Sequence, residues 1–264
     1  MKHFKLAGLT LKISSEIQMP EEWESFVEQN GDLQTAFSLH RLNPVTVNQD
    51  ICYSDITAMK TVMLSGASFL LADSDYQNVY IWQNINDRAI ETLSAYVFYT
   101  HAVRHQMLQL HCATIDDRGR GVLFLGPSGI GKTTQAERWA AYRGASIING
   151  DVGFVQRTPQ GFTAWGTPWH GSLPYCLNAG VPVRALVVLK QSPHNALRAL
   201  TGFERVQEVS ESVFYPTWLE DGMALCTETL NHLLTDLPVY RLDNRADQAA
   251  VALLAEELDR ITEG

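Results

Sequence analysis

Hydrophobic and polar residues alternate over short stretches in the first third of the chain. In residues 4–13 an apolar residue recurs at nearly every second position, and residues 79–82 form a second short apolar run. A two-residue period is typical of a strand with one buried face. Between these runs, Met19 and Pro20 followed by two glutamates favour the start of a short helix. The first part of the chain is therefore predicted to be rich in strands.

A helical pattern follows. Apolar residues recur at helical spacing from Ile90 to Val97, and the pattern ends near Leu108. Asn86 or Asp87 can cap the N-terminus of this helix. No proline- or glycine-rich linker interrupts the chain here. We therefore expect three parts: a β-rich N-terminal subdomain at 1–85, a connecting helix at 86–108 and an α/β domain at 109–264.

Strand and helix patterns alternate in the third part, which is typical of an α/β core. Strands are predicted at 108–115, 122–125, 147–148 and 186–189, and helices at 134–143 and 247–258. The polar, glycine-containing segment 116–121 is expected to join the first two strands as a hairpin.

Composition narrows the functional class. Apolar residues make up 45% of the 264 residues, which is enough to form a core and excludes wholesale disorder. The net charge of −9 argues against a general nucleic-acid partner. The four cysteines are widely spaced and form no CxxC pair, so free thiols are expected. The most apolar stretch, 62–72, is too short to cross a membrane, and we expect a soluble, cytoplasmic protein.

The strongest motif lies at 126–133, where the sequence GPSGIGKT matches the phosphate-binding pattern G-x-x-x-x-G-K-[ST]. A buried strand precedes it, and a helix with Gly144 as its C-cap follows. Glycines let successive backbone N–H groups point at phosphate oxygens, and the helix N-terminus adds partial positive charge. The candidate nucleotide-binding residues are Gly126, Ser128, Gly129, Ile130, Gly131, Lys132, Thr133 and Thr134.

Two of these side chains carry further chemistry. Lys132 can hold the outer phosphates of ATP, and the Thr133 hydroxyl can ligate Mg²⁺. A standard P-loop ATPase also has an aspartate after a later apolar strand, but the run 186–189 is followed by Lys190. Asp151, which follows the strand next after the P-loop helix, is the alternative acid. It can accept a proton from a hydroxyl or hold the metal, unless it is a turn residue after Asn-Gly.

His111, the loop at 126–133 and Asp151 together resemble the catalytic domain of HPr kinase/phosphorylase. That domain is similar in its nucleotide-binding core to ATP-dependent phosphoenolpyruvate carboxykinase. The pattern looks still more like a diverged bacterial branch of HPr-kinase-like proteins that includes kinases of lasso-peptide precursors. The resemblance covers roughly residues 105–260. It implies an α/β fold with a P-loop core of HPr kinase type beside the β-rich subdomain.

The resemblance also implies roles for single residues. Lys132 and the loop amides hold the β- and γ-phosphates, Thr133 and Asp151 bind Mg²⁺, and Asp151 is the general base. His111 lines the same site and helps to orient phosphate or acid, although it can equally be a plain strand histidine.

The sequence departs from the family at several points. Gly150 stands where the family often has a second acid, which weakens the case for phosphorolysis. The family's later glutamate ligand has no clear counterpart in residues 165–171, where His170 can replace it. The HPr-docking signature is not evident, so HPr itself is not the expected substrate.

Four further residues are candidates for contact with the substrate. Trp169 and His170 lie in a segment rich in tryptophan, which suits gripping a base, a peptide or a sugar but equally a loop packed on the sheet. Arg184, before a buried strand, and Arg205, in a helical stretch, can stabilise a transferring phosphoryl group, although each is more often a surface or ion-pair residue.

We therefore interpret the chain as an ATP- and Mg²⁺-dependent phosphotransferase that acts on a hydroxyl, in a serine or threonine of a peptide or protein such as a natural-product precursor. The β-rich part would shape the acceptor pocket. Two alternatives stay open, namely a non-catalytic nucleotide or phosphate sensor and a P-loop kinase of a small metabolite. HPr kinases form hexamers, but the resemblance alone does not carry that state to this chain, so a homo-oligomer stays an open option.

Overall fold

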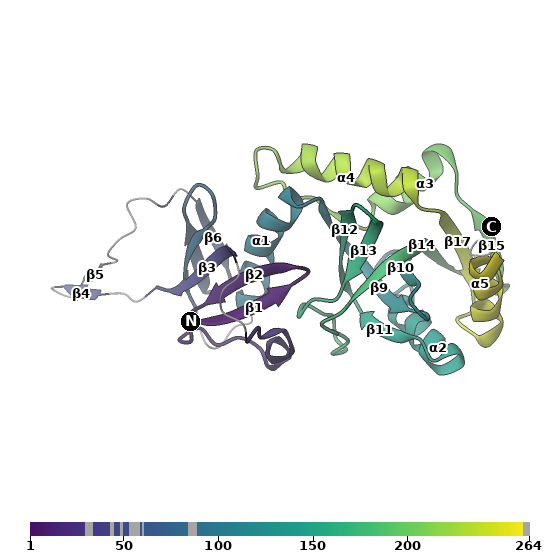
Figure 1. The fold of residues 1–264 in the computed structure, drawn as a ribbon, viewed down its shortest axis with the longest axis horizontal. Helices are drawn as coiled ribbons and strands as arrows, with labels where there is room; N and C mark the ends of the chain where they lie inside the picture. The colour runs from purple at the N-terminus through teal and green to yellow at the C-terminus, as the bar shows by residue number, and fades with distance from the viewer. Residues whose placement is uncertain are drawn as a thin grey trace. The chain divides into compact units, whose positions relative to one another are not determined.

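The chain folds into two compact units of mixed α/β structure, Met1–Ala102 and Val103–Gly264 (Figure 1). The computed structural model describes residues 1–29, 34–42, 45–47, 50–52, 59, 61–83 and 89–260. Along these residues, no helix combines the length and the apolar character that a membrane crossing requires. Helix α1 (Ala89–Arg104) belongs to the first unit except for its last two residues.

The first unit is built on a six-stranded sheet in the order β1-β2-β3-β8-β7-β6. The short helix predicted from Met19 and Pro20 is the 3-10 helix η1, which buries Trp23 and Phe26. The strand predicted at 79–82 is confirmed as β8. The elements before α1 are β1 (Lys2–Leu6), β2 (Leu9–Ile13), η1 (Glu21–Phe26), β3 (Thr35–Arg41), β4 (Val45–Val47), β5 (Asp50–Cys52), β6 (Thr61–Ser65), β7 (Ser68–Ala72) and β8 (Asn78–Trp82).

Residues 4–13 do not form one strand, as their alternation suggested, but contribute to a hairpin. Strands β1 and β2 pair antiparallel, with Leu6 opposite Leu9. Ala7 and Gly8 form the turn with φ of 47° and 80°. Two successive residues with positive φ allow the tight hairpin turn whose twist matches that of the strands, and glycine adopts this conformation without strain. The apolar face is thus kept while the chain reverses direction.

Helix α1 is shorter at its C-terminus than the sequence suggested. The helix ends at Arg104, Gln106 has a positive φ of 56°, and β9 begins at Met107. The predicted caps, Asn86 and Asp87, lie outside the described residues. Near its end α1 packs on its own unit, because the His101 ring stacks on Phe37 with centroids 5.0 Å apart.

The second unit contains a nine-stranded sheet and four helices among its described residues. Its elements are β9 (Met107–Asp116), β10 (Gly121–Leu125), α2 (Lys132–Arg143), β11 (Ser146–Asn149), β12 (Val152–Thr158), β13 (Gly161–Trp165), β14 (Gly180–Gln191), β15 (Ala196–Ala199), α3 (Gly202–Ser210), β16 (Val213–Phe214), α4 (Gly222–Asp236), β17 (Val239–Asn244) and α5 (Gln248–Arg260). The predicted hairpin around 116–121 is confirmed, with Asp116 opposite Gly121.

Strand β9 pairs with four other strands of this sheet. One edge pairs antiparallel with β11 and then β12, and the other edge with β10 and then β16. On the first edge the partner changes between Thr114, which pairs with Asn149 of β11, and His111, which pairs with Val152 of β12. The turn between β11 and β12 therefore lies beside the middle of β9, and this turn contains Asp151.

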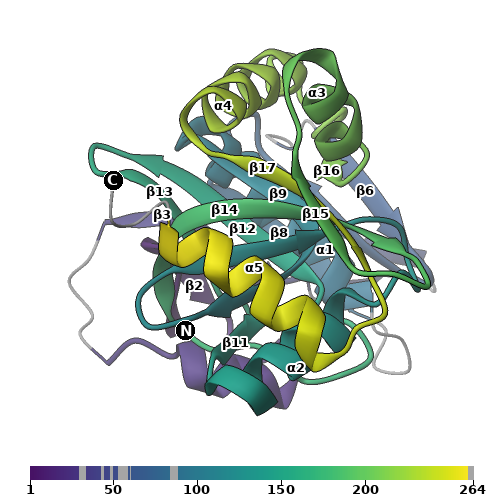
Figure 2. The same ribbon diagram turned by 90° about the vertical axis from the view of Figure 1, so that its right-hand side faces the viewer.

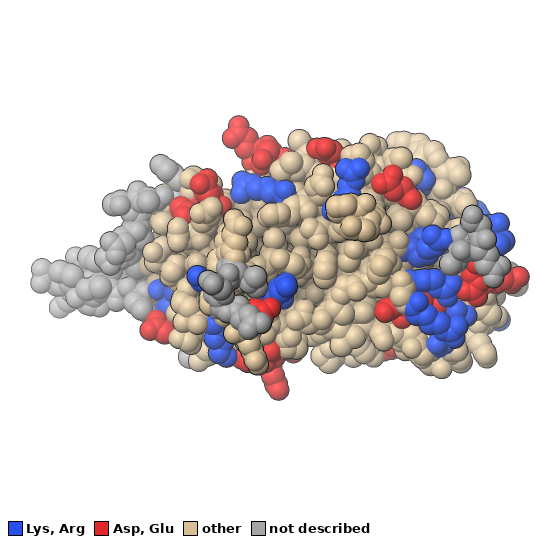
Figure 3. Space-filling view, viewed as in Figure 1, with Lys and Arg blue, Asp and Glu red and all other residues tan. Residues whose placement is uncertain are grey.

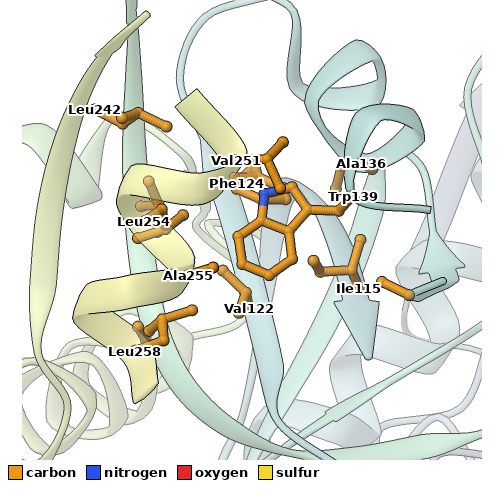
Figure 4. Close-up of a cluster of buried hydrophobic side chains, with 14 of the residues drawn as sticks. Ile115, Val122, Phe124, Ala136, Trp139, Leu242, Val251, Leu254, Ala255 and Leu258 are labelled. Carbon is orange, nitrogen blue, oxygen red and sulfur yellow. The ribbon is translucent and has the colours of Figure 1, made fainter. Parts of the chain in front are cut away.

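Strands β10, β14 and β17 are adjacent and parallel. Parallel strands end at the same edge of a sheet, so the segments that follow them lie close together. Helices α2 and α5 cover one face of this part of the sheet, as Figure 2 shows. The core between them centres on Trp139, whose indole lies among Val251, Ala255 and Ile115 (Figure 4).

Charged side chains gather over the part of the second unit that carries α5. Figure 3 shows lysines and arginines there with acidic side chains among them. Arg120 and Arg143 both bond the buried carboxylate of Asp117, and Arg120 also bonds Asp259. These ion pairs tie the β9–β10 turn to α2 and α5.

Candidate functional site

The loop between β10 and α2 contains three glycines with positive φ. Gly126, Gly129 and Gly131 have φ of 135°, 78° and 108°, conformations that a side chain would strain. Helix α2 starts immediately after Gly131 and ends at Arg143. Gly144 follows with a φ of 69°, which confirms the predicted C-cap. Unpaired N–H groups and the helix dipole make such a terminus favourable for negative charge.

Lys132 lies at the start of α2 and is largely buried, with 6% of its surface exposed. Its Nζ donates to the carbonyl oxygens of Gly126 at 3.0 Å and of Pro127 at 3.3 Å. Burial lowers the pKa of the ammonium, and the negative charge of Asp151 opposes this shift. The lysine thus bonds two carbonyls of the loop and places its positive charge against them.

Thr133 links the loop to the turn that carries Asp151. Its hydroxyl donates to the Gly150 carbonyl oxygen at 3.1 Å. The backbone of Asp151 is also fixed on the other side, because its carbonyl accepts a hydrogen bond from the Cys112 amide at 3.0 Å. The residue that the sequence suggested as the acid therefore lies beside the glycine-rich loop.

His111 and Asp151 form a direct contact. Nε2 of His111 donates to Oδ1 of Asp151 at 3.1 Å, and both side chains are partly exposed. This hydrogen bond is the largest cause of a lowered pKa of Asp151, with smaller contributions from the charges of His111, Lys132 and His170. Burial acts in the opposite direction. The carboxyl group is therefore ionised at neutral pH.

A buried asparagine that the sequence reasoning missed organises this turn. The side-chain oxygen of Asn149 accepts hydrogen bonds from the amides of Asp151 and Val152, each at 2.9 Å. Its nitrogen donates to the carbonyls of Thr167 at 3.1 Å and Trp169 at 2.8 Å. The available signal was the Asn-Gly pair, which indicated a turn but not these contacts to residues 18 and 20 positions away.

Tyr175 bonds both to the same turn and to helix α2. Its carbonyl accepts a hydrogen bond from the Gly150 amide at 3.1 Å, and its hydroxyl donates to Glu137 on α2 at 3.0 Å. A Cβ at Gly150 would lie 3.3 Å from the Tyr175 side chain. At position 150, where the resemblance would suggest a second acid, the glycine therefore packs against Tyr175.

In the segment 165–171, His170 acts on Asp151, whereas Trp169 belongs to the core. The Nδ1 of His170 donates to the Gly171 carbonyl at 2.8 Å, and its charge acts on Asp151. Gly171 is close to the same carboxylate, since a Cβ there would lie 3.1 Å from Cγ of Asp151. Trp169 is 6% exposed and packs against Phe154, so its indole belongs to the core beneath the segment.

The two candidate arginines lie on β14 and on α3. Arg184 does not precede a strand but lies within β14, next to Val183, which pairs with Gly121 at the start of β10. It is therefore at the opposite end of β10 from the loop. Arg205 lies half-buried on α3. Lys190, at the position of the missing acid, pairs with Glu208 of α3 at 3.0 Å.

The donor set near the loop fits a metal that is bound mainly by its substrate. Among the described residues, no three or more histidine, cysteine or acidic side chains converge as a metal site. The Thr133 hydroxyl and the ionised Asp151 carboxylate supply oxygen atoms next to the loop. Mg²⁺ prefers oxygen ligands and is commonly held by one or two carboxylates, phosphate oxygens and water.

Fold and site together define an α/β protein in which a hydrogen bond joins a glycine-rich loop to the turn that carries a histidine-bonded carboxylate. The sequence matches the family described as SynChlorMet cassette protein ScmC over residues 83–243, which is more than half of the chain. The chain therefore belongs to the ScmC family.

Two further comparisons add little. No curated protein matches the sequence. Among solved structures, the HPr(Ser) kinase/phosphatase from Coxiella burnetii is similar with a TM-score of 0.37 and 12% identity, over 59% of this chain and 99% of that chain. A likeness of that degree does not bear on the function.

Proposed function

We propose that the chain is an ATP- and Mg²⁺-dependent phosphotransferase that acts on the hydroxyl of a serine or threonine in a peptide or protein. The second unit would be a P-loop core of HPr kinase type, and the first unit would recognise the acceptor. The hydrogen bond from Thr133 to the Gly150 carbonyl carries the proposal. It ties a loop suited to phosphate directly to the residue before the carboxylate of Asp151.

On the donor side, the loop and Lys132 would bind the triphosphate of ATP. Two of the three N–H donors of the ammonium hold loop carbonyls, which leaves the third for a phosphate oxygen. The Thr133 hydroxyl and Asp151 would hold Mg²⁺, which when bound neutralises charge on the β- and γ-phosphates.

On the acceptor side, Asp151 would act as the base. His111 donates to Oδ1, which leaves Oδ2 to take the proton of the acceptor hydroxyl. The hydroxyl oxygen forms a bond to the γ-phosphorus, the bond from that phosphorus to the bridging oxygen breaks, and its electron pair leaves with ADP. A lowered pKa makes Asp151 a weak base, which suits phosphoryl transfer because catalysis there rests mainly on positioning and charge.

The proposal is tested by measuring ATP affinity and phosphoryl transfer separately. Calorimetry with ATP and Mg²⁺ gives the affinity, and radiolabelled γ-phosphate on an array of serine and threonine peptides gives the transfer. Lys132→Ala should weaken ATP binding by about tenfold or more, because it removes a charge-assisted contact. Asp151→Asn should retain ATP affinity and reduce transfer by about two orders of magnitude or more. Glu256→Gln, at an exposed carboxylate on α5, is the matched control.

Each alternative gives a different result. Saturable ATP binding without transfer to any peptide or metabolite would support a nucleotide sensor, an option that the missing acid at Gly150 favours. Transfer to small metabolites but not to peptides would support a metabolite kinase. Turnover of Asp151→Asn at the rate of the unmodified protein would remove Asp151 as the base.

A further inference from the structure

A cavity of about 570 Å³ adjoins the glycine-rich loop. One wall comes from Gly129, Ile130 and Gly131 with Thr134, and the others from residues 191–193 and 244–246. The size lies within the range of about 300–1,000 Å³ that is usual for small-molecule sites. The cavity is therefore large enough for a ligand that extends beyond the phosphate loop.

The topology explains why these three segments meet. Residues 191–193 follow the end of β14 and residues 244–246 follow the end of β17, while the glycine-rich loop follows β10. The three strands are parallel neighbours, so the crevice lies outside their carboxyl ends. Open parallel sheets bind ligands in that position.

Hydrogen bonds within the chain hold both new walls. The buried amide of Asn244 accepts a hydrogen bond from the Ala246 amide at 2.8 Å and donates to the Leu242 carbonyl at 3.2 Å. The Ser192 amide donates to the Asn244 carbonyl at 3.1 Å, which joins the two segments. The chain's own hydrogen bonds therefore shape the walls, and such preorganisation reduces the ordering that binding requires.

The side chains of the walls suit a flat, uncharged ring system. Arg245 is exposed, and its Nη2 pairs with Asp247 at 2.8 Å, which restrains the guanidinium. A planar guanidinium stacks on aromatic rings. Ile130 and Pro193 add apolar surface, and Gln191 and Ser192 add polar groups that can bond hydroxyls.

We propose that this cavity binds the nucleoside part of a nucleoside triphosphate, with the base at Arg245 and the ribose towards the glycine-rich loop. The inference rests on the proposed function, because the phosphates must occupy the loop for the nucleoside to reach the cavity. It assigns a binding role to residues 191–193 and 244–246.

The test compares ATP with inorganic tripolyphosphate, which has the phosphates but no nucleoside. Calorimetry is run on the full chain with Mg²⁺. Arg245→Ala should weaken ATP binding by about two- to fivefold, the effect of losing a stacking contact at an exposed side chain, and should leave tripolyphosphate unchanged. Ser192→Trp, which fills the cavity, should act in the same direction. Arg260→Ala, which removes an exposed arginine on α5, is the control.

The results separate this inference from the proposed function. If Lys132→Ala weakens both ligands while Arg245→Ala and Ser192→Trp bind ATP normally, the nucleoside lies elsewhere and only this inference fails. If either cavity variant weakens tripolyphosphate as much as ATP, the cavity does not select the nucleoside and the inference also fails. If the unmodified protein binds neither ligand, the proposed function fails and the inference with it. Melting temperatures near that of the unmodified protein confirm that the variants are folded.

Discussion

The side-chain oxygen of Asn149 holds the backbone of Asp151 through a hydrogen bond of 2.9 Å. The same amide group joins the turn to the segment 165–171 through two carbonyls. Asn149 is fully buried, so none of its four bonds can be replaced by bulk water without opening the structure. The position of the candidate base thus depends on a residue that does not need to touch a substrate.

Replacing Asn149 should therefore affect both stability and the site. Asn149→Ala leaves two partly buried N–H groups and two carbonyls without this partner, and we expect the free energy of unfolding to fall by about 2–4 kcal/mol. Asn149→Asp should also destabilise, because its second carboxylate oxygen would face two carbonyl oxygens. Urea unfolding measures both effects, with Gln160→Ala at an exposed position as the control. If Asn149→Asp were as stable as the unmodified protein, the assigned donor contacts would be incorrect.

The sequence predicted the loop and its helix well because both are local. Positive φ at Gly129 and Gly131, the start of α2 and the cap at Gly144 all follow from neighbouring residues. The hairpin around 116–121 is likewise set by its own turn residues. A local signal was also present where the prediction of one strand over residues 4–13 was wrong. Gly8 marks the turn of the hairpin, which the alternation alone did not reveal.

The contacts that assemble the site are not local, and this is why they escaped prediction. The Asn149 amide reaches Thr167 and Trp169, which no periodicity connects to it. Arg184 looked suitable because arginines stabilise phosphate, but the register of β14 against β10 places it away from the loop. The cavity depends on which loops follow adjacent parallel strands, and strand order cannot be derived from one sequence.

His111 should control the pH at which Asp151 loses its charge. Its hydrogen bond is the main cause of the lowered pKa, so His111→Ala should raise the pKa of Asp151 towards its usual value of about 3.9. The acid limb of the pH profile of kcat/KM should then move to higher pH. His105→Ala, at an exposed histidine, should leave it in place. An unchanged acid limb in His111→Ala, with normal folding, would mean that the pair does not set this ionisation.

The same contact should give a pH-dependent contribution to stability. Because the pKa of Asp151 is lower in the folded than in the unfolded state, the contribution is present above about pH 4 and disappears as the pH falls through the folded-state value. The difference in unfolding free energy between the unmodified protein and His111→Ala should therefore be larger at pH 7 than at pH 3. A difference that stays constant between these pH values would assign the loss to packing against Phe214 instead.

Thr133 bonds the Gly150 carbonyl and is proposed to bind Mg²⁺, and two substitutions can separate these two roles. Thr133→Ser keeps the hydroxyl that donates to Gly150, whereas Thr133→Val removes it at similar size. We expect Thr133→Val to weaken ATP binding by roughly tenfold when Mg²⁺ is present and to have much less effect when the metal is chelated. Thr133→Ser should resemble the unmodified protein in both conditions. Equal losses with and without Mg²⁺ in Thr133→Val would indicate that the hydroxyl only holds the turn.

The close approach of β9 and β12 beside the site can be tested by a double-mutant cycle. A Cβ at Gly153 would lie 2.4 Å from Sγ of Cys112, whose thiol is buried and has its pKa raised to about 11 by that burial. Gly153→Ala should therefore destabilise the protein by about 1–3 kcal/mol through overpacking. Cys112→Ala removes the clashing sulfur, so the double variant should be less destabilised than the two single changes added together.

Cys226→Ala, at a buried cysteine on α4, provides the matched comparison, because its effect should simply add to that of Gly153→Ala. The coupling should also appear in activity, since Gly153 is two residues from Asp151 and its strand neighbour Val152 pairs with His111. We expect Gly153→Ala to lower phosphoryl transfer and Cys112→Ala to restore part of it. If the losses of Gly153→Ala and Cys112→Ala simply add in the double variant, β12 relieves the clash by moving away from β9. The contact between His111 and Asp151 would then be lost in Gly153→Ala, whatever residue occupies position 112.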